Sequence, residues 1–373
     1  MVEWQSVRLG TVVSTNQSTY SIKENWQFVN YLDTGNITMN RIDKIQYINT
    51  LMDKLPSRAR RKVKLNSIIY STVRPNQLHY GMIKEQPENF LVSTGFVVID
   101  VNSEKAVPDY LYYVLTQKEI TEQLQAIAEQ SVSAYPSLKP SDIENLEVLL
   151  PDIDTQKGIV AVLHAIDEKI KQNIEINNNL EQQAQAIFDN MFPNISNGSY
   201  AIGDYITPKR GKSLLSKNAI FGDVPVIAGG LEPSTYHNVA NTQSPVLAIS
   251  ASGANAGYVS LWNIPIWSSD SSYIDSSMTD DVYFWYVLLK KRQKEIFDAQ
   301  TGSAQPHIYP QHIASMSVSN LDIEEVHSYT SIVTPIFKKI GHHKEENTRL
   351  ASLRDTLLPK LMSGELDVSD IKL

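Results

Sequence analysis

Cysteine is absent from all 373 residues of the chain, which excludes disulfides and cysteine-bearing zinc sites. No uncharged apolar run approaches the ~20 residues that a membrane-spanning helix needs. The first residues, MVEWQSVRLGTVV, have no basic patch followed by an apolar core, so they do not resemble a secretory signal. We therefore predict a soluble, cytoplasmic protein with no membrane partner.

Positive charge is also scarce overall, because 33 Lys and Arg residues are outnumbered by 41 Asp and Glu and leave a formal net charge of −8. This balance argues mildly against a stand-alone nucleic-acid binder, since binding to phosphates relies on Lys and Arg. The objection applies to the average and not to local patches. With 42% hydrophobic and 20% charged residues, the composition is ordinary for a globular protein of two or three domains.

Catalytic motifs are missing as well. RGKS at 210–213 resembles the end of a phosphate-binding loop, but the glycine required five positions before Gly211 is replaced by Ile206. The sequence contains no G-x-S-x-G nucleophile elbow and no Asn/Asp-Pro-Pro-aromatic element of the amino-methyltransferase kind. No histidine pair has metal-ligand spacing except His342 and His343, which face different sides of a helix. We therefore predict neither a catalytic residue nor a metal site.

An internal repeat is the strongest positive feature. SAYPSLKPSDI at 133–143 returns as SAQPHIYPQHI at 303–313, with a constant offset of 170 from Ser133 to Ser303. The match continues at the same offset without a gap, through the pairs Asp152 and Asp322, Ile166 and Ile336, Lys169 and Lys339, Glu175 and Glu345, and Leu180 and Leu350. An ungapped match of this length over two helical segments indicates duplication.

Both repeated segments have the apolar spacing of a coiled coil, with alternating steps of four and three residues. The first seam contains Ile159, Leu163, Ile166, Ile170, Asn173, Asn177, Leu180, Ala184, Ile187 and Met191. The second contains Tyr329, Val333, Ile336, Ile340, His343, Asn347, Leu350, Arg354, Leu357 and Leu361. Both seams become polar at the same place, which is Asn173 and Asn177 in one and His343 and Asn347 in the other.

Polar seam residues usually lower stability and set the register of a helix pair. In antiparallel pairing, Asn173 would lie near Asn347, and Asn177 would lie near His343. Parallel pairing would also align the polar layers, so the seam alone does not choose the direction. The alternative is two separate amphipathic helices, each covering its own domain.

The segments between the helices, residues 1 to about 145 and 196 to about 315, show weaker echoes of each other. LGTVV at 9–13 resembles IGDYI at 202–206. Short β-like runs such as NSIIYSTV at 66–73 and PVLAISASG at 245–253 predict a mixed α/β domain in each segment.

Each of these segments contains a stretch with basic but no acidic residues. Seven Lys and Arg residues fall between Lys54 and Arg74, and TPKRGKSLLSK at 207–217 supplies four more. No acidic or basic side chain occurs between Glu232 and Asp270, where Ser, Asn, Gly and Trp are frequent. A basic run is often a solvated surface. Two such runs in duplicated domains nevertheless favour DNA, because cations bind phosphates while amides and Arg read base edges.

Four stretches are typical of one family: STGFVVI at 93–99, SAYPSLKPSDIENLEVLLP at 133–151, QKGIVAVLHAIDEKIKQNIEINNNLEQQAQAIFDNMF at 156–192, and LASLRDTLLPKLMSGELDV at 350–368. Through them the chain resembles the specificity (S) subunit of a type I restriction-modification system. The resemblance covers essentially the whole chain, and it is specific only when the four stretches are taken together.

The resemblance implies an α/β (α+β) fold with two globular target-recognition domains and two long helices that form an antiparallel coiled coil, related by a pseudo-twofold internal repeat. The expected segments are a first recognition domain at 1–145, a spacer helix at 146–195, a second recognition domain at 196–315, and a second spacer helix with the C-terminal tail at 316–373.

The resemblance also implies a function. Each recognition domain would read one half of a split double-stranded DNA target, and the helices would dock two methyltransferase subunits, through which restriction subunits join. The chain itself would be non-catalytic and bind no cofactor, with S-adenosylmethionine, ATP and Mg expected on the partner subunits. The alternative is a stand-alone DNA-binding or scaffold protein without modification partners.

The DNA-binding candidates follow from position. In the first domain we expect a basic loop with Arg58, Arg60, Arg61 and Lys62, followed by Arg74 and Asn76. In the second domain we expect Lys209, Arg210, Lys212 and Ser213, then Ser252 and Asn255. Lys and Arg would mostly hold phosphates, whereas Asn76 and Asn255 would read adenine edges. The exposed faces of 159–191 and 329–361 are the candidates for methyltransferase docking.

Overall fold

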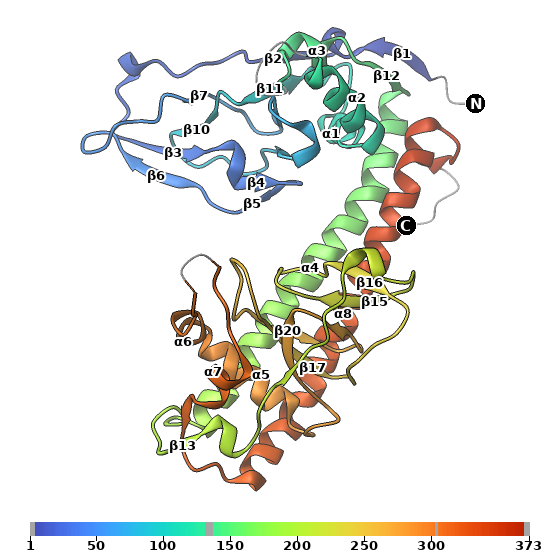
Figure 1. Ribbon diagram of the computed structural model, residues 1–373. Coiled ribbons are helices and arrows are strands. Elements are labelled where there is room, and N and C mark those ends of the chain that lie inside the picture. The colour runs from blue at the N-terminus through green and yellow to red at the C-terminus, as the bar shows by residue number, and fades with distance from the viewer. Residues whose placement is uncertain (1–3, 131–136, 303–304, 369–373) are drawn as a thin grey trace. The chain divides into compact units, whose positions relative to one another are not determined.

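The computed structural model describes residues 4–130, 137–302 and 305–368 and divides into two compact units (Figure 1). Unit 1 comprises residues 1–168 and 350–373, and unit 2 comprises residues 169–349. Helix α4 (Ile153–Met191) and helix α8 (Ile323–Ser363) contribute to both units. No helix within the described ranges is long and apolar enough to cross a membrane.

The described part of unit 1 contains two four-stranded sheets and two smaller ones. The first sheet has the order β2-β11-β8-β9, formed by Val13–Thr15, Phe96–Val101, Ile68–Ser71 and Tyr80–Met82. The second has the order β6-β3-β10-β7, formed by Gln46–Asn49, Phe28–Leu32, Phe90–Ser93 and Ala59–Arg61. The two-stranded sheets pair β1 (Gln5–Arg8) with β12 (Glu147–Leu150) and β4 (Ile37–Thr38) with β5 (Arg41–Ile42). Its helices are α1 (Pro108–Leu115), α2 (Lys118–Glu129) and α3 (Pro140–Glu144).

Unit 2 repeats this arrangement with fewer strands. One sheet has the order β14-β20-β17-β18, formed by Lys209–Arg210, Ser271–Asp275, Val246–Ser250 and Val259–Trp262. A second has the order β16-β15-β19, formed by Thr235–His237, Val224–Ile227 and Trp267–Ser268, and a third pairs β13 (Tyr200–Ala201) with β21 (Ser317–Val318). Its short helices are α5 (Val282–Lys291), α6 (Gln293–Asp298) and α7 (Pro310–Ala314).

The two units therefore share one topology. Strands β2, β11, β8 and β9 correspond in order to β14, β20, β17 and β18. The second sheet of each unit contains a parallel pair, β3 with β10 in one and β15 with β19 in the other. Helices α3 and α7 begin at Pro140 and Pro310, and α4 and α8 begin at Ile153 and Ile323, which keeps the sequence offset. The duplication thus extends from the long helices through both sheet domains.

The repeated proline motif marks the start of a short helix in each unit. Pro140 and Pro310 occupy the first turns of α3 and α7. Proline suits this position, because its fixed φ fits a helix and its missing N–H would have no partner in the first turn. The beginnings of both motifs, 133–136 and 303–304, lie outside the described residues.

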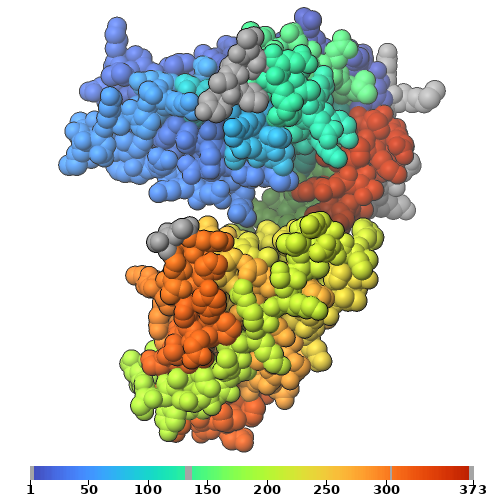
Figure 2. Space-filling model, viewed as in Figure 1, coloured from blue at the N-terminus to red at the C-terminus, as the bar shows by residue number. Residues whose placement is uncertain are grey.

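The core of unit 1 joins its sheet domain to both long helices. Ile159 and Leu163 of α4 and Leu361 of α8 are buried in one cluster with Leu9, Tyr110 and other residues of the first domain. Figure 2 shows this end of α8, in red, against the surface of the domain. Gly364 also lies against Trp4, since a Cβ added to Gly364 would be 2.6 Å from Trp4 Nε1.

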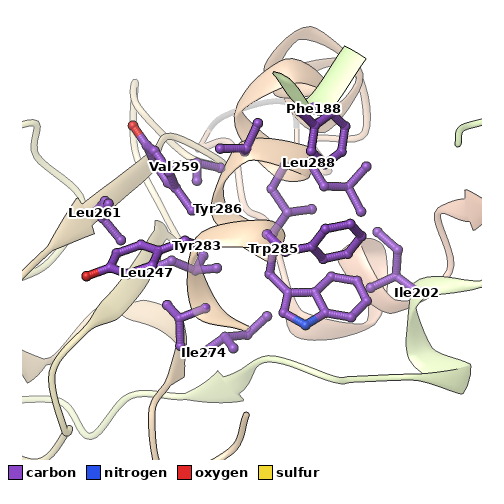
Figure 3. Packing of buried hydrophobic residues seen from close by; sticks show 14 of the residues in the cluster. Phe188, Ile202, Leu247, Val259, Leu261, Ile274, Tyr283, Trp285, Tyr286 and Leu288 are labelled. Carbon is purple, nitrogen blue, oxygen red and sulfur yellow. The ribbon is translucent and has the colours of Figure 1, made fainter. Parts of the chain in front are cut away.

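The core of unit 2 is aromatic at its contact with α4. Phe188 has ring-centroid distances of 5.1 Å to Phe192, 5.6 Å to Phe284 and 5.4 Å to Tyr329. Helix α5 lies at the centre of this core (Figure 3). Its apolar run VYFWYVLL is buried all round, because one side contacts the sheet and the other contacts the long helices.

The architecture confirms the predicted fold class. Strands and helices are mixed in both units, and α4 and α8 pack antiparallel in each of them: Ile159 shares a cluster with Leu361 in unit 1, and the Tyr329 hydroxyl donates to the Ala184 carbonyl at 3.1 Å in unit 2. The alternative of two unpaired amphipathic helices is wrong.

Candidate functional site

The polar seam residues form a hydrogen-bonded layer between α4 and α8 in unit 2. Asn173 Nδ2 donates to Asn347 Oδ1 at 2.8 Å and to Glu346 Oε2 at 2.7 Å. Asn177 Oδ1 lies 2.8 Å from His343 Nδ1. Both contacts are those expected for antiparallel pairing. Their role in setting the register stays a prediction.

The hydrogen bonds of Asn177 assign the proton on His343. Asn177 Nδ2 donates to the Ile340 carbonyl at 3.4 Å, so Oδ1 faces the imidazole and accepts from Nδ1–H. Burial lowers the pKa of His343, and the nearby Lys339 acts in the same direction. The imidazole is therefore neutral near pH 7. Its buried Nδ1–H depends on Asn177 Oδ1 as its hydrogen-bond acceptor.

This dependence predicts opposite effects for single and paired substitutions. Asn177→Ala leaves the buried Nδ1–H of His343 without an acceptor and should lower the free energy of unfolding by about 1–3 kcal/mol. Replacing both Asn177 and His343 by Leu should restore most of the loss, because the pair then leaves no polar group without a partner in the seam. Urea titration followed by tryptophan fluorescence measures both effects.

Asn179→Ala is the matched control, because Asn179 lies on the same helix but is exposed. It should change stability by no more than about 0.5 kcal/mol. A paired Leu variant less stable than Asn177→Ala would contradict this account of the layer.

The predicted basic loop of the first domain is wrong. Residues Ala59–Arg61 form strand β7, which pairs with β10, and the Arg60 carbonyl accepts from the Tyr20 N–H at 2.7 Å. Buried Ala59 and Val63 anchor the segment in the sheet, and a run of charges does not reveal that anchoring. Side chains alternate along a strand, so adjacent Arg60 and Arg61 point to opposite faces.

The four cationic side chains of residues 58–62 differ in how accessible they are to DNA. Arg58 is exposed, whereas Arg60 and Arg61 are half-buried and burial lowers the pKa of Arg61. Lys62 Nζ lies 2.5 Å from Glu24 and 5.1 Å from the centre of the Trp26 ring. Among these four candidates, Arg58 is the most accessible to a phosphate.

Arg74 and Asn76 lie in the turn between β8 and β9, which belongs to the other sheet of unit 1. Both are exposed. The Asn76 N–H donates to Gln125 Oε1 at 3.2 Å, which ties this turn to α2 and leaves the Asn76 amide at the surface. Unit 1 therefore distributes its candidates over two sheets.

In unit 2, two of the predicted residues converge on a carboxylate. Arg210, at the end of β14, has Nη2 2.5 Å from Asp270 Oδ1. The Ser252 hydroxyl donates to Asp270 Oδ2. Sequence reasoning missed Asp270, because it appeared only as the first charge after an uncharged stretch. Its partner lies 60 residues earlier in the chain, and local charge patterns do not show such a pairing.

The remaining candidates of unit 2 lie on the same segments as Arg210 and Ser252. Lys209 lies on β14 and is exposed, as are Lys212 and Ser213, which follow it. Asn255 is half-buried in the turn after β17, where its carbonyl accepts from the Tyr258 N–H at 3.0 Å.

The backbone of the basic segment is held against β19. The Lys212 N–H donates to the Ser268 carbonyl at 2.9 Å, and Trp267 Nε1 donates to the Lys212 carbonyl at 2.8 Å. Gly211, which precedes Lys212, approaches the sheet so closely that a Cβ would lie 2.5 Å from the Ser268 carbonyl oxygen. The glycine is required by this contact, and the segment presents Lys212 from a constrained backbone.

Known proteins match this chain along its length. A family model described as the type I restriction modification DNA specificity domain matches residues 1–182. The type I restriction enzyme HindI specificity subunit of Haemophilus influenzae is 24% identical over 98% of this chain and 100% of that protein. The MjaIX specificity subunit of Methanocaldococcus jannaschii is 24% identical over 73% of this chain and 72% of its own length. Residues 1–182 thus match the type I restriction modification DNA specificity domain, and the chain is similar to type I specificity subunits along nearly its whole length.

A solved structure shares the fold. The type I restriction-modification S subunit from M. genitalium covers 97% of this chain and 96% of its own, with a TM-score of 0.60 and 19% sequence identity. The comparisons confirm the resemblance seen in the sequence, and the matched specificity domain supports a role in DNA recognition.

An exposed lysine on the constrained segment predicts a measurable salt effect. Lys212→Ala should weaken duplex-DNA binding and reduce the slope of log K against log salt by about one, because one phosphate contact is lost. Lys294→Ala removes an exposed lysine from α6 of the same unit and should leave the slope unchanged. Equal slopes for wild type and Lys212→Ala would remove this lysine from the interface.

Proposed function

We propose that this specificity subunit reads a bipartite duplex DNA target, one half with each sheet domain, and docks two methyltransferase subunits on its long helices. The observation that supports this most is the repetition of one topology with different side chains at equivalent turns. A duplicated framework with divergent turns suits a target whose two halves differ in sequence.

The turn between the two sheets illustrates the divergence. In unit 2, Ser269 and Asp270 connect β19 to β20, and Asp270 binds Arg210. In unit 1, the equivalent turn between β10 and β11 is Thr94-Gly95, and Thr94 donates its N–H to the Arg58 carbonyl at 2.8 Å. The same place in the fold thus offers a charged pair in one domain and uncharged groups in the other.

The long helices carry apolar side chains that neither core uses. Ile174 and Ile176 on α4 are 50% and 45% exposed, and Ile332 on α8 is 47% exposed. Exposed apolar residues on otherwise polar helices are common where a partner helix packs. They support these helices as the docking surface for methyltransferase subunits.

In this proposal the chain contributes recognition and no catalytic group. S-adenosylmethionine would act on the methyltransferase subunits, and ATP and Mg²⁺ on restriction subunits that join through them. The second candidate, a stand-alone DNA-binding protein, gives no use to the exposed isoleucines of the helices.

Methylation of host DNA tests the proposal directly. The chain should be expressed with its neighbouring methyltransferase in a methylation-free host, and the modified adenines mapped by modification-sensitive sequencing. We expect methylation on a split motif that disappears when either protein is omitted. Replacing residues 196–315 by those of a relative should change one half of the motif and leave the other half intact.

The absence of methylation despite a soluble complex and an active methyltransferase would favour the stand-alone binder. A domain replacement that alters both halves of the motif would contradict the assignment of one domain to one half-site.

The docking surface makes a separate prediction. Ile176→Asp and Ile174→Asp should each weaken binding of the methyltransferase by at least about tenfold, because a buried isoleucine contributes roughly 1.5–3 kcal/mol. Isothermal titration calorimetry measures the affinity. The matched control is Ile220→Asp, which makes the same substitution at a residue that is 59% exposed in the variable part of unit 2. If all three variants bind equally well, docking lies elsewhere.

A further inference from the structure

We propose that Arg210 recognises a guanine in the half-site read by unit 2, and that Asp270 is the positioning residue that orients it. This inference rests on the proposed function and adds a base type and a residue pair to it.

The geometry places three strand ends together. In the sheet order β14-β20-β17, Arg210 ends β14, Asp270 directly precedes β20, and Ser252 follows β17. Because β20 is antiparallel to both neighbours, Arg210, Asp270 and Ser252 lie at the same end of these three adjacent strands. The backbone is fixed there as well, since the Ala251 N–H donates to the Asp270 carbonyl at 3.1 Å.

Both oxygens of the carboxylate are occupied. Oδ1 accepts from Arg210 Nη2 at 2.5 Å, and Oδ2 accepts from the Ser252 hydroxyl. Ser252 thereby limits rotation of the Asp270 carboxylate, and the carboxylate holds Nη2 of the Arg210 guanidinium in place. This arrangement is an orienting device made of side chains from three neighbouring strands.

Stability does not account for the pair. The Arg210 and Asp270 side chains are 41% and 38% exposed, and ion pairs at that exposure contribute little to folding. The pair instead leaves most of the five guanidinium donors of Arg210 available at the surface in a fixed orientation.

The chemistry of an oriented guanidinium favours a base over a phosphate. A phosphate can be neutralised by a flexible ammonium, and exposed Lys209 and Lys212 adjoin Arg210 in sequence for that purpose. A guanine presents O6 and N7 side by side in the major groove, where two parallel N–H groups of arginine match them. The carboxylate also disfavours a phosphate next to it, because both are negative.

The first domain has no equivalent pair at this place. The turn that corresponds to Asp270 is Thr94-Gly95, and the last residue of β2, at the place of Arg210 in the topology, is Thr15, whose hydroxyl donates to Glu144 Oε1 at 2.5 Å. The Arg210–Asp270 pair therefore occurs at this place in only one of the two domains, as expected of a residue pair that determines specificity for one half-site.

The experiment compares methylated motifs for Arg210→Lys and Asp270→Ala with that of wild type, each expressed with the methyltransferase. We expect the wild-type motif to contain a guanine in the half assigned to residues 196–315. Both variants should relax the requirement at that one position, with a loss of about tenfold to a hundredfold in discrimination between guanine and other bases. Arg210→Lys keeps the charge, so binding to unrelated DNA should persist.

Asp109→Asn is the matched control, because it removes a carboxylate whose Oδ1 pairs with Lys84 Nζ at 2.7 Å in unit 1. It should leave the motif unchanged. Thermal unfolding checks that Asp270→Ala folds, and Arg210→Lys tests the inference independently of that variant.

The possible failures are distinguishable. If wild type methylates no split motif, the proposed function and this inference both fail. If wild type methylates a split motif that Arg210→Lys leaves unchanged, only the inference fails. A uniform loss of binding across all sequences would show that Arg210 makes no base-specific contact, and it would also overturn the inference.

Discussion

The antiparallel packing of α4 against α8 is the interaction on which both units depend. In each unit the sheet domain buries its apolar face against a section of this pair, through Ile159 and Leu361 in unit 1 and through Phe188 and Tyr329 in unit 2. One apolar cluster in each unit combines residues of the sheet domain with residues of both helices. The heptad spacing therefore determines both the helix pair and the surfaces on which the domains are built.

We expect the polar layer to give this pair a defined alignment. An apolar seam can slide by one heptad at modest cost, whereas Asn177 and His343 satisfy each other only in one alignment. A shift would also displace the domain cores that share the helices. We therefore expect the buried polar groups to lower stability while favouring a single arrangement of the elements that carry the domains.

Periodic features of the chain were predictable, and contacts between distant segments were not. The seam residues and the polar layer follow from spacing, because a helix relates residues that are close in sequence. Strand β7 was mistaken for a loop, since its basic composition conceals that Ala59 and Val63 are buried. Asp270 was missed because its meaning depends on Arg210 and Ser252, which only the sheet order brings together.

The same division explains how one fold can serve many DNA targets. Substitutions in the seam or in the aromatic core around Phe188 would disturb the framework of a whole unit, whereas the turn containing Asp270 lies at the surface and forms no part of the described apolar clusters. Groups at such a turn can change while the sheet order and the helix pair are maintained. Thr94-Gly95 and Ser269-Asp270 occupy equivalent turns of one topology with different chemistry. In the proposed function, recognition would be located at such turns, where side chains can change without disturbing the framework.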